Sequence, residues 1–163
     1  MKIPLNEENY KDLRSNANDF LNTRAKSKKT PGTSYKSITG NKILFITPSH
    51  TDTGKHYIQT VILKDLPTLI EKYKTSVKPI DIVRKAMLGD ILIDCTCPAW
   101  LYWGFKYKGT KYGYSAEKEI RPPKERNPGL KGSTCKHLDN AMYVLPFLAT
   151  RITADLIKQG IFK

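Results

Sequence analysis

The chain has 163 residues and a mean hydropathy of -0.47, which suits a single domain with a hydrophobic core. It carries 28 lysines and arginines against 15 acidic residues, for a formal net charge of +13. No apolar run approaches the roughly 20 residues that cross a bilayer, so we expect neither a membrane span nor a membrane partner. The charge favours an anionic partner, with nucleic acid first and an acidic protein surface second, although a lysine-rich surface also serves solubility alone.

The N-terminal region, residues 1–33, is expected to form a helix followed by a basic arm. Apolar side chains recur at helical spacing over 7–23, which predicts an amphipathic helix. The stretch 24–32 is basic and rich in helix breakers, so it indicates a linker or a mobile arm that contacts a partner, with a solvated loop as an equal alternative. The candidate contacts in this arm are Lys26, Lys28 and Lys29.

The second region, residues 34–89, is expected to hold a β-meander and two helices. Short segments of strand-forming residues, separated by turn signals, predict three antiparallel strands. These strands are expected at 34–38, 42–47 and 56–63. Asp65 is expected to cap a helix that ends near Tyr73, and Pro79 to open a second helix that ends near Leu88.

The third region, residues 90–163, begins with a strand at 90–97 and an aromatic stretch at 100–114. The glycine-containing turn signal at 108–111 predicts that the aromatic stretch folds as a hairpin. The polar stretch 115–133 contains three prolines and two glycines, which indicates a long loop.

A long C-terminal helix is predicted from Cys135 towards Gly160, with a break around Pro146. Its core face is expected to consist of Leu138, Met142, Leu145, Leu148, Ile152, Leu156 and Ile157. Together these elements predict an α+β fold in which a small antiparallel sheet packs with helices as one compact domain.

Two short pairs of soft metal-ligand residues limit the chemistry of this chain. Cys95 and Cys97 are one residue apart, as are Cys135 and His137, and 37 residues separate the two pairs. The pairs use every cysteine in the chain, and four such ligands in two clusters match a closed tetrahedral zinc site. Residues two apart on a strand point to the same side, so Cys95 and Cys97 can reach one ion.

Other interpretations of the cysteines explain less of the pattern. A disulfide framework would leave one thiol over, and a catalytic Cys–His pair would not explain why the remaining cysteines cluster. Buried or redox-active thiols stay open as an alternative. The energetics favour one structural zinc ion, because closing the loop costs on the order of 4 kcal/mol while structural zinc supplies roughly 10–16 kcal/mol.

The sequence favours a non-enzymatic protein. Four protein ligands leave no open metal position for a water molecule, as a catalytic zinc site would require. No nucleophile–base pair, carboxylate cluster or phosphate-binding loop stands out, and no small-molecule substrate is expected. His50 and His56 flank a turn, and we expect plain surface residues there rather than a second metal site.

The pattern Cys-X-Cys, a long gap and Cys-X-His resembles the SWIM-type zinc finger. The matching residues are Cys95, Cys97, Cys135 and His137, and the resemblance implies that all four ligate zinc in a ββα-like unit. The elements predicted from this sequence give that unit the order strand, hairpin and helix. Members of that family are associated with DNA binding or protein–protein contacts. The resemblance covers roughly residues 90–150, and the gap of 37 residues is long for it.

A narrower resemblance lies in the residues around the two pairs, 94–100 and 126–138. They look like small structural proteins of tailed bacteriophages. This resemblance implies a virion component of the head, neck or tail, made in the host cytoplasm and contacting other virion proteins, with DNA as a further partner. The alternative is a cytoplasmic SWIM-like module that binds nucleic acid in DNA metabolism or regulation. Zinc thiolates and the polar N-terminus also suggest synthesis in a reducing cytosol.

Partner contacts are expected on the aromatic and basic segment between the ligand pairs. Its aromatic side chains can stack bases or pack as a core around zinc, and its basic side chains can track phosphates or face solvent. The candidate contacts are Trp103, Lys106, Lys108, Lys111, Arg121, Lys124, Arg126 and Lys131.

Overall fold

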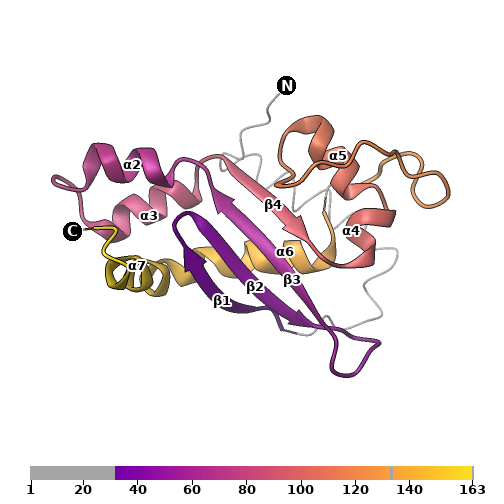
Figure 1. Ribbon diagram of the computed structural model, residues 1–163, viewed down its shortest axis with the longest axis horizontal. Helices are drawn as coiled ribbons and strands as arrows, with labels where there is room; N and C mark the ends of the chain where they lie inside the picture. The colour runs from indigo at the N-terminus through magenta and orange to yellow at the C-terminus, as the bar shows by residue number, and fades with distance from the viewer. Residues whose placement is uncertain (1–31, 133, 163) are drawn as a thin grey trace.

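A four-stranded antiparallel sheet organises the residues that the computed structural model describes, 32–132 and 134–162 (Figure 1). Its strands follow chain order and are β1 (Ser34–Thr39), β2 (Lys42–Pro48), β3 (His56–Leu63) and β4 (Ile91–Cys95). The predicted three-stranded meander is confirmed, and the strand predicted at 90–97 joins it as the fourth neighbour. The helix predicted at 7–23 and the three candidate lysines of the basic arm lie outside the described residues.

Side chains along each strand alternate between a buried face and a partly exposed face of the sheet. Ile43 and Thr47 of β2 are both 0% exposed, while the residue after each is not buried. The strand register places Ile43 opposite Val61, and Gln59 opposite Cys95. One face of the sheet therefore carries both the apolar core and the first predicted metal ligand.

Helices from both halves of the chain pack behind and beside the sheet, which confirms the α+β class (Figure 1). They are α2 (Leu66–Tyr73), α3 (Pro79–Met87), α6 (Lys136–Val144), the 3-10 helix η1 (Leu145–Leu148) and α7 (Ala149–Lys158). The predicted break at Pro146 is present as η1, because proline has no N–H group for the regular helical hydrogen bond. Ile157 was expected on the core face, but it is 50% exposed because Leu156 beside it takes the buried position.

The aromatic stretch 100–114 is not a hairpin, and this prediction was wrong. It forms two helices, α4 (Pro98–Tyr102) and α5 (Phe105–Tyr112). Gly104 and Gly113 both have positive φ, of 76° and 82°, so glycines delimit α5 at both ends. The predicted turn at 108–111 lies inside α5.

Asp65 occupies the N-cap position of α2 as predicted, but its side chain does not cap the helix. Its carboxylate instead accepts a hydrogen bond from the backbone N–H of Asp90 at 3.1 Å. A side chain at Gly89 would collide with that carboxylate. The interaction therefore ties the start of α2 to the start of β4.

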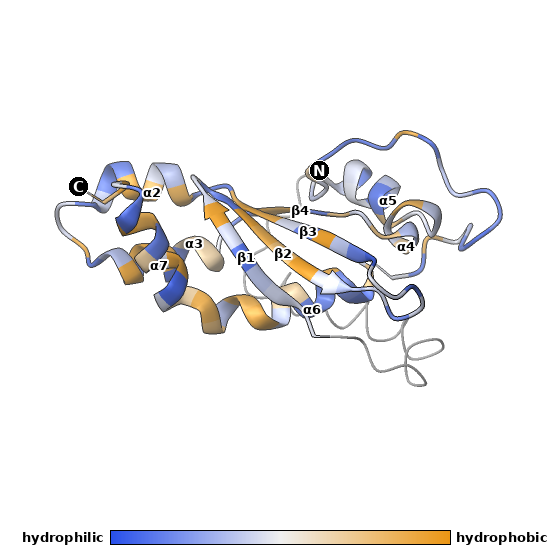
Figure 2. Cartoon of the chain, turned by 60° about the horizontal axis from the view of Figure 1, so that its bottom comes forward, coloured by the Kyte–Doolittle hydropathy of each residue, from blue (hydrophilic) through white to orange (hydrophobic). Residues whose placement is uncertain are grey.

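Hydrophobic residues concentrate on the strands and on the helices behind them, whereas the stretch that follows α5 is largely hydrophilic (Figure 2). The predicted division into three regions stays a prediction. Across the described ranges, no helix has both the length and the apolar composition needed to cross a membrane.

Candidate metal centre

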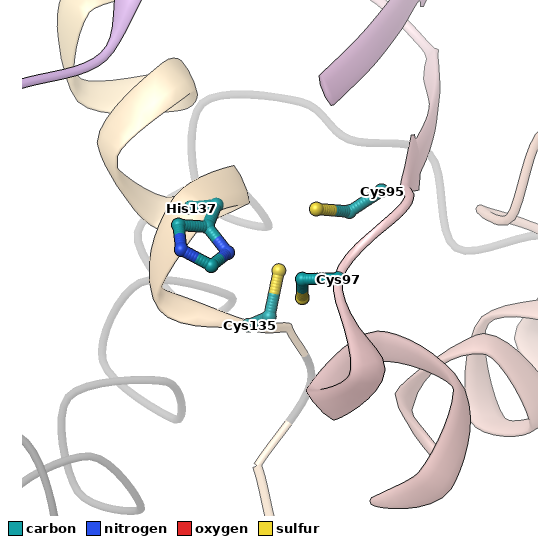
Figure 3. Close-up of side chains that lie close together, drawn as sticks. All are labelled: Cys95, Cys97, Cys135 and His137. Carbon is teal, nitrogen blue, oxygen red and sulfur yellow. The ribbon is translucent and has the colours of Figure 1, made fainter. Parts of the chain in front are cut away.

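Cys95, Cys97, Cys135 and His137 come together in one buried group, which we call the ligand cluster (Figure 3). Their potential ligand atoms all lie within 4.8 Å of one another. Each of the four residues is at most 5% exposed. The sequence places the two pairs far apart, so the fold itself brings these donors to one point.

The first pair lies where β4 passes into α4. Cys95 is the last residue of β4, and Cys97 is the N-cap residue of α4 in an extended conformation, with Pro98 as the first helical residue. Thr96 continues the strand pairing beyond β4, because its N–H donates to the oxygen of Ile58 and its hydroxyl accepts from the N–H of Ile58. The backbone between the two sulfurs is therefore held against β3.

The second pair lies at the start of α6. Cys135 is the N-cap residue of this helix, and His137 lies in its first turn. The imidazole ring of His137 faces the sulfur atoms in Figure 3 and packs against the ring of Tyr57, with centroids 5.1 Å apart. Its Nδ1 atom is buried and has no hydrogen-bond partner among the described residues. A metal ion between the ring and the sulfurs would satisfy such a nitrogen.

The three thiols share a buried site, and burial disfavours the charged thiolate form when no cation is present. Burial raises the pKa of the Cys95 and Cys135 thiols. Hydrogen bonds from Cys135 and Cys95 lower the pKa of Cys97. Three thiolates together are therefore disfavoured here without a cation, and a divalent cation would allow all three thiols to lose their protons.

The donor set fits a small tetrahedral metal ion. At the usual zinc–sulfur distance, two sulfurs of a tetrahedral site lie about 3.8 Å apart. The observed limit of 4.8 Å between ligand atoms is close to this value, so the group needs only small side-chain movements to close around an ion. We conclude that the ligand cluster can hold one metal ion.

Gln59 borders the ligand cluster, and sequence reasoning missed it. Its side-chain Nε2 atom lies 3.7 Å from the Sγ atom of Cys95. The sequence does hold a sign of its role. Gln59 is a polar residue in the alternating series of β3 positions that otherwise holds the apolar Val61 and Leu63. A buried amide on an apolar strand face requires partners.

Eight candidate contacts lie in the segment between the ligand pairs. Two of them, Lys106 and Lys108, are partly buried lysines that bond to other groups of the protein. The Lys106 Nζ atom lies 2.9 Å from a Glu117 oxygen and 3.7 Å from an Asp94 oxygen. The Lys108 Nζ atom donates to the backbone oxygens of Leu130 and Gly132, at 3.1 Å and 2.7 Å. These two lysines hold the segment together.

The other candidate contacts lie in different surroundings. Arg121 is exposed and forms paired hydrogen bonds with the Glu119 carboxylate, at 2.7 Å and 2.9 Å, and Trp103 packs against the core as a partly buried residue. Three exposed candidates lie on α5 or in the loop after it, and a fourth lies next to Gly132. They are Lys111, Lys124, Arg126 and Lys131.

An open groove of about 710 Å³ lies between α4 and the 119–126 loop. Its walls include Tyr102, Arg121, Lys124 and Arg126. Tyr102 is 63% exposed, so the groove presents an aromatic ring beside basic side chains, together with the acidic Glu119 and Glu125. His50 and His56 are exposed and take no part in the ligand cluster.

Comparisons with family models, curated proteins and solved structures find no match for this chain. The resemblance to SWIM-type zinc fingers therefore rests on the four ligand residues, and it stays a prediction. The function of the chain is inferred from its own geometry, in which a buried group of three sulfurs and one imidazole can bind a metal ion.

Proposed function

We propose that the ligand cluster binds one zinc ion with a structural, non-enzymatic role. The single observation that carries this proposal is the buried convergence of three cysteine sulfurs and one histidine within 4.8 Å. Such a donor set is typical of closed structural zinc sites, and four protein ligands fill the tetrahedral shell. Catalysis at the metal would instead need a coordination position open to water or substrate.

The ion would act as a clasp across residues 98–134. It joins the end of β4 and the start of α4 to the start of α6, so both ends of this 37-residue segment are fixed at one point. The segment also has internal ties. The Asn127 side chain donates to the backbone oxygens of Trp103 and Lys131. The clasp and these bonds together hold the segment as a defined surface.

The charge of this segment favours an anionic partner. It contains eight lysines and arginines and three glutamates, for a net charge of +5. The groove beside Tyr102 adds an exposed aromatic ring to the basic surface. Nucleic acid and an acidic protein surface both suit this combination. Membership of a bacteriophage virion stays a prediction from the sequence resemblance.

Metal analysis of the purified protein tests the zinc proposal. We expect one zinc ion per chain in the wild type by elemental mass spectrometry, and loss of that ion in Cys135→Ser. Cobalt substitution should give the intense visible and sulfur-to-metal bands of a tetrahedral thiolate site. A chain that purifies and refolds without bound metal would overturn the proposal.

Salt-dependent binding tests the partner. If the segment binds nucleic acid, the logarithm of the affinity should fall with the logarithm of salt concentration, with a slope of about -0.9 for each phosphate contact on duplex DNA. Charge reversal at Lys124 and Arg126 should reduce the slope, whereas charge reversal at Lys72 and Lys74, two exposed lysines at the end of α2, should not. Absence of binding at low salt would leave an acidic protein surface as the partner class.

A further inference from the structure

Gln59 is a fully buried polar side chain beside the ligand cluster. It lies on β3 directly opposite Cys95 and is 0% exposed. Its Nε2 atom lies 3.7 Å from the Cys95 sulfur and 3.0 Å from the backbone oxygen of Tyr57. Both partners are acceptors, so the two N–H groups of the amide are both used.

The carbonyl oxygen of Tyr57 fixes the orientation of this amide, and two threonine hydroxyls continue the hydrogen bonds from it. The Thr47 hydroxyl donates to the Gln59 oxygen at 2.8 Å, which uses its single proton. Thr47 must therefore accept the bond that joins it to Thr33, whose hydroxyl oxygen lies 2.9 Å away. A flipped amide would place the Gln59 oxygen against the carbonyl oxygen of Tyr57. Only one orientation satisfies every partner.

The resulting chain of hydrogen bonds has one direction. It runs from Thr33 to Thr47, then to Gln59, and its last N–H points at the Cys95 sulfur. Each donor polarises the next in such a chain, and the effect is largest in a buried, weakly polar environment. The chain therefore directs a polarised N–H group at that sulfur.

We propose that Gln59 is a positioning residue of the metal centre, which orients the Cys95 thiolate towards the ion and tunes its electron donation through an N–H···S hydrogen bond. The inference rests on the proposed zinc function. Tyr57, two residues earlier on the same strand face, packs against the ring of His137. Side chains of β3 thus support one ligand from each pair.

The test compares Gln59→Leu with the matched control Gln159→Leu. Gln159 also donates through its side-chain amide to a backbone oxygen, that of Ile38 at 2.7 Å, but it lies next to α7 and outside the ligand cluster. Zinc affinity is measured by competition with a chromophoric chelator, and cobalt spectra report the sulfur-to-metal charge-transfer band. We expect Gln59→Leu to lower zinc affinity about 10- to 100-fold. The band should shift to lower energy, because the sulfur loses a hydrogen-bond donor. Gln159→Leu should change neither value.

The outcomes separate this inference from the zinc proposal. Wild-type protein without a thiolate–cobalt band would overturn the zinc proposal. A normal wild-type band together with an unchanged band in Gln59→Leu would overturn the positioning role alone, even if affinity fell through a general loss of stability. Thr47→Val leaves Gln59 unchanged and removes only the hydroxyl that donates to its oxygen. This variant takes the place of Gln59→Leu in the test if Gln59→Leu does not fold. Its band must shift in the same direction by a smaller amount, and an unshifted band would contradict the directed chain.

Discussion

Removing the metal ion should loosen residues 98–134 far more than the sheet, and Cys135→Ser is the change that tests this. The ion would cross-link two ligand pairs around 37 residues, a constraint worth about 4 kcal/mol. Since about 1.4 kcal/mol corresponds to a factor of ten, amide hydrogen exchange in this segment should accelerate by up to roughly a thousandfold. The expected loss is local, because the segment depends on the clasp at both ends.

The other end of the hydrophobic core contains no ligand. Val83 of α3 and Ile152 and Leu156 of α7 are each 0% exposed and pack away from the ligand cluster. We therefore expect β1, β2, α3 and α7 to keep most of their protection from exchange. Hydrogen exchange with mass spectrometry would compare zinc-loaded wild type, chelated wild type and Cys135→Ser.

A chelator supplies the internal control. Cys135→Ser should match chelated wild type, and the chelator should have no further effect on the mutant. Equal zinc content in mutant and wild type would show that Cys135 is not a ligand. Uniform acceleration over β1 and α7 would refute the local clasp, since it would mean that the ion supports the whole fold.

Three further predictions test single features. Lys108→Met removes a donor to two backbone oxygens in the following loop, and urea titration should show a loss of about 1–2 kcal/mol in the free energy of unfolding. Gly104→Ala places a side chain on a backbone with φ 76° and should lower the free energy of unfolding by about 1–3 kcal/mol in the same assay. Gly129→Ala is the control, because Gly129 has open space around it and no positive φ, and it should change the free energy of unfolding little. Arg121→Met should raise the pKa of Glu119 from about 2 towards its ordinary 4.5 in an NMR titration. Because the folded-state pKa is lowered, the pair stabilises the fold above pH 4.5 and loses that effect as pH falls towards 2, so the stability gap between wild type and Arg121→Met should narrow over this range.

The strands and the ligands could be predicted because their signals are local. Alternation along 42–47 and 56–63 fixes which side chains face the core, and the two ligand pairs are recognisable from spacing alone. The hairpin prediction is wrong because Gly109, which reads as a turn signal in the sequence, does not form a turn. In the structure Gly109 lies inside α5, where a side chain would crowd the ring of Tyr114. Pro98 directly after Cys97 was the available sign of a helix start.

The surface charges could not be assigned from the sequence, because their partners are distant along the chain. Lys108 and the oxygen of Gly132 are 24 residues apart, and only the fold shows that this cation is used internally. Gln59 and Cys95 are 36 residues apart, so the N–H···S contact depends on the register between β3 and β4. Spacing predicts which residues can bind a metal, whereas strand register decides what supports them.

The two halves of the ligand cluster are organised in different ways. Cys97 and Cys135 are both N-cap residues with extended backbones, so helix starts set their direction locally. Thr96 fixes the first pair to β3, whereas the second pair lies at the start of α6. The distance between the pairs instead depends on the packing of α6 against β3 and β4. Metal affinity should therefore respond to core packing under α6 as well as to the ligands, because that packing determines whether the four donors meet.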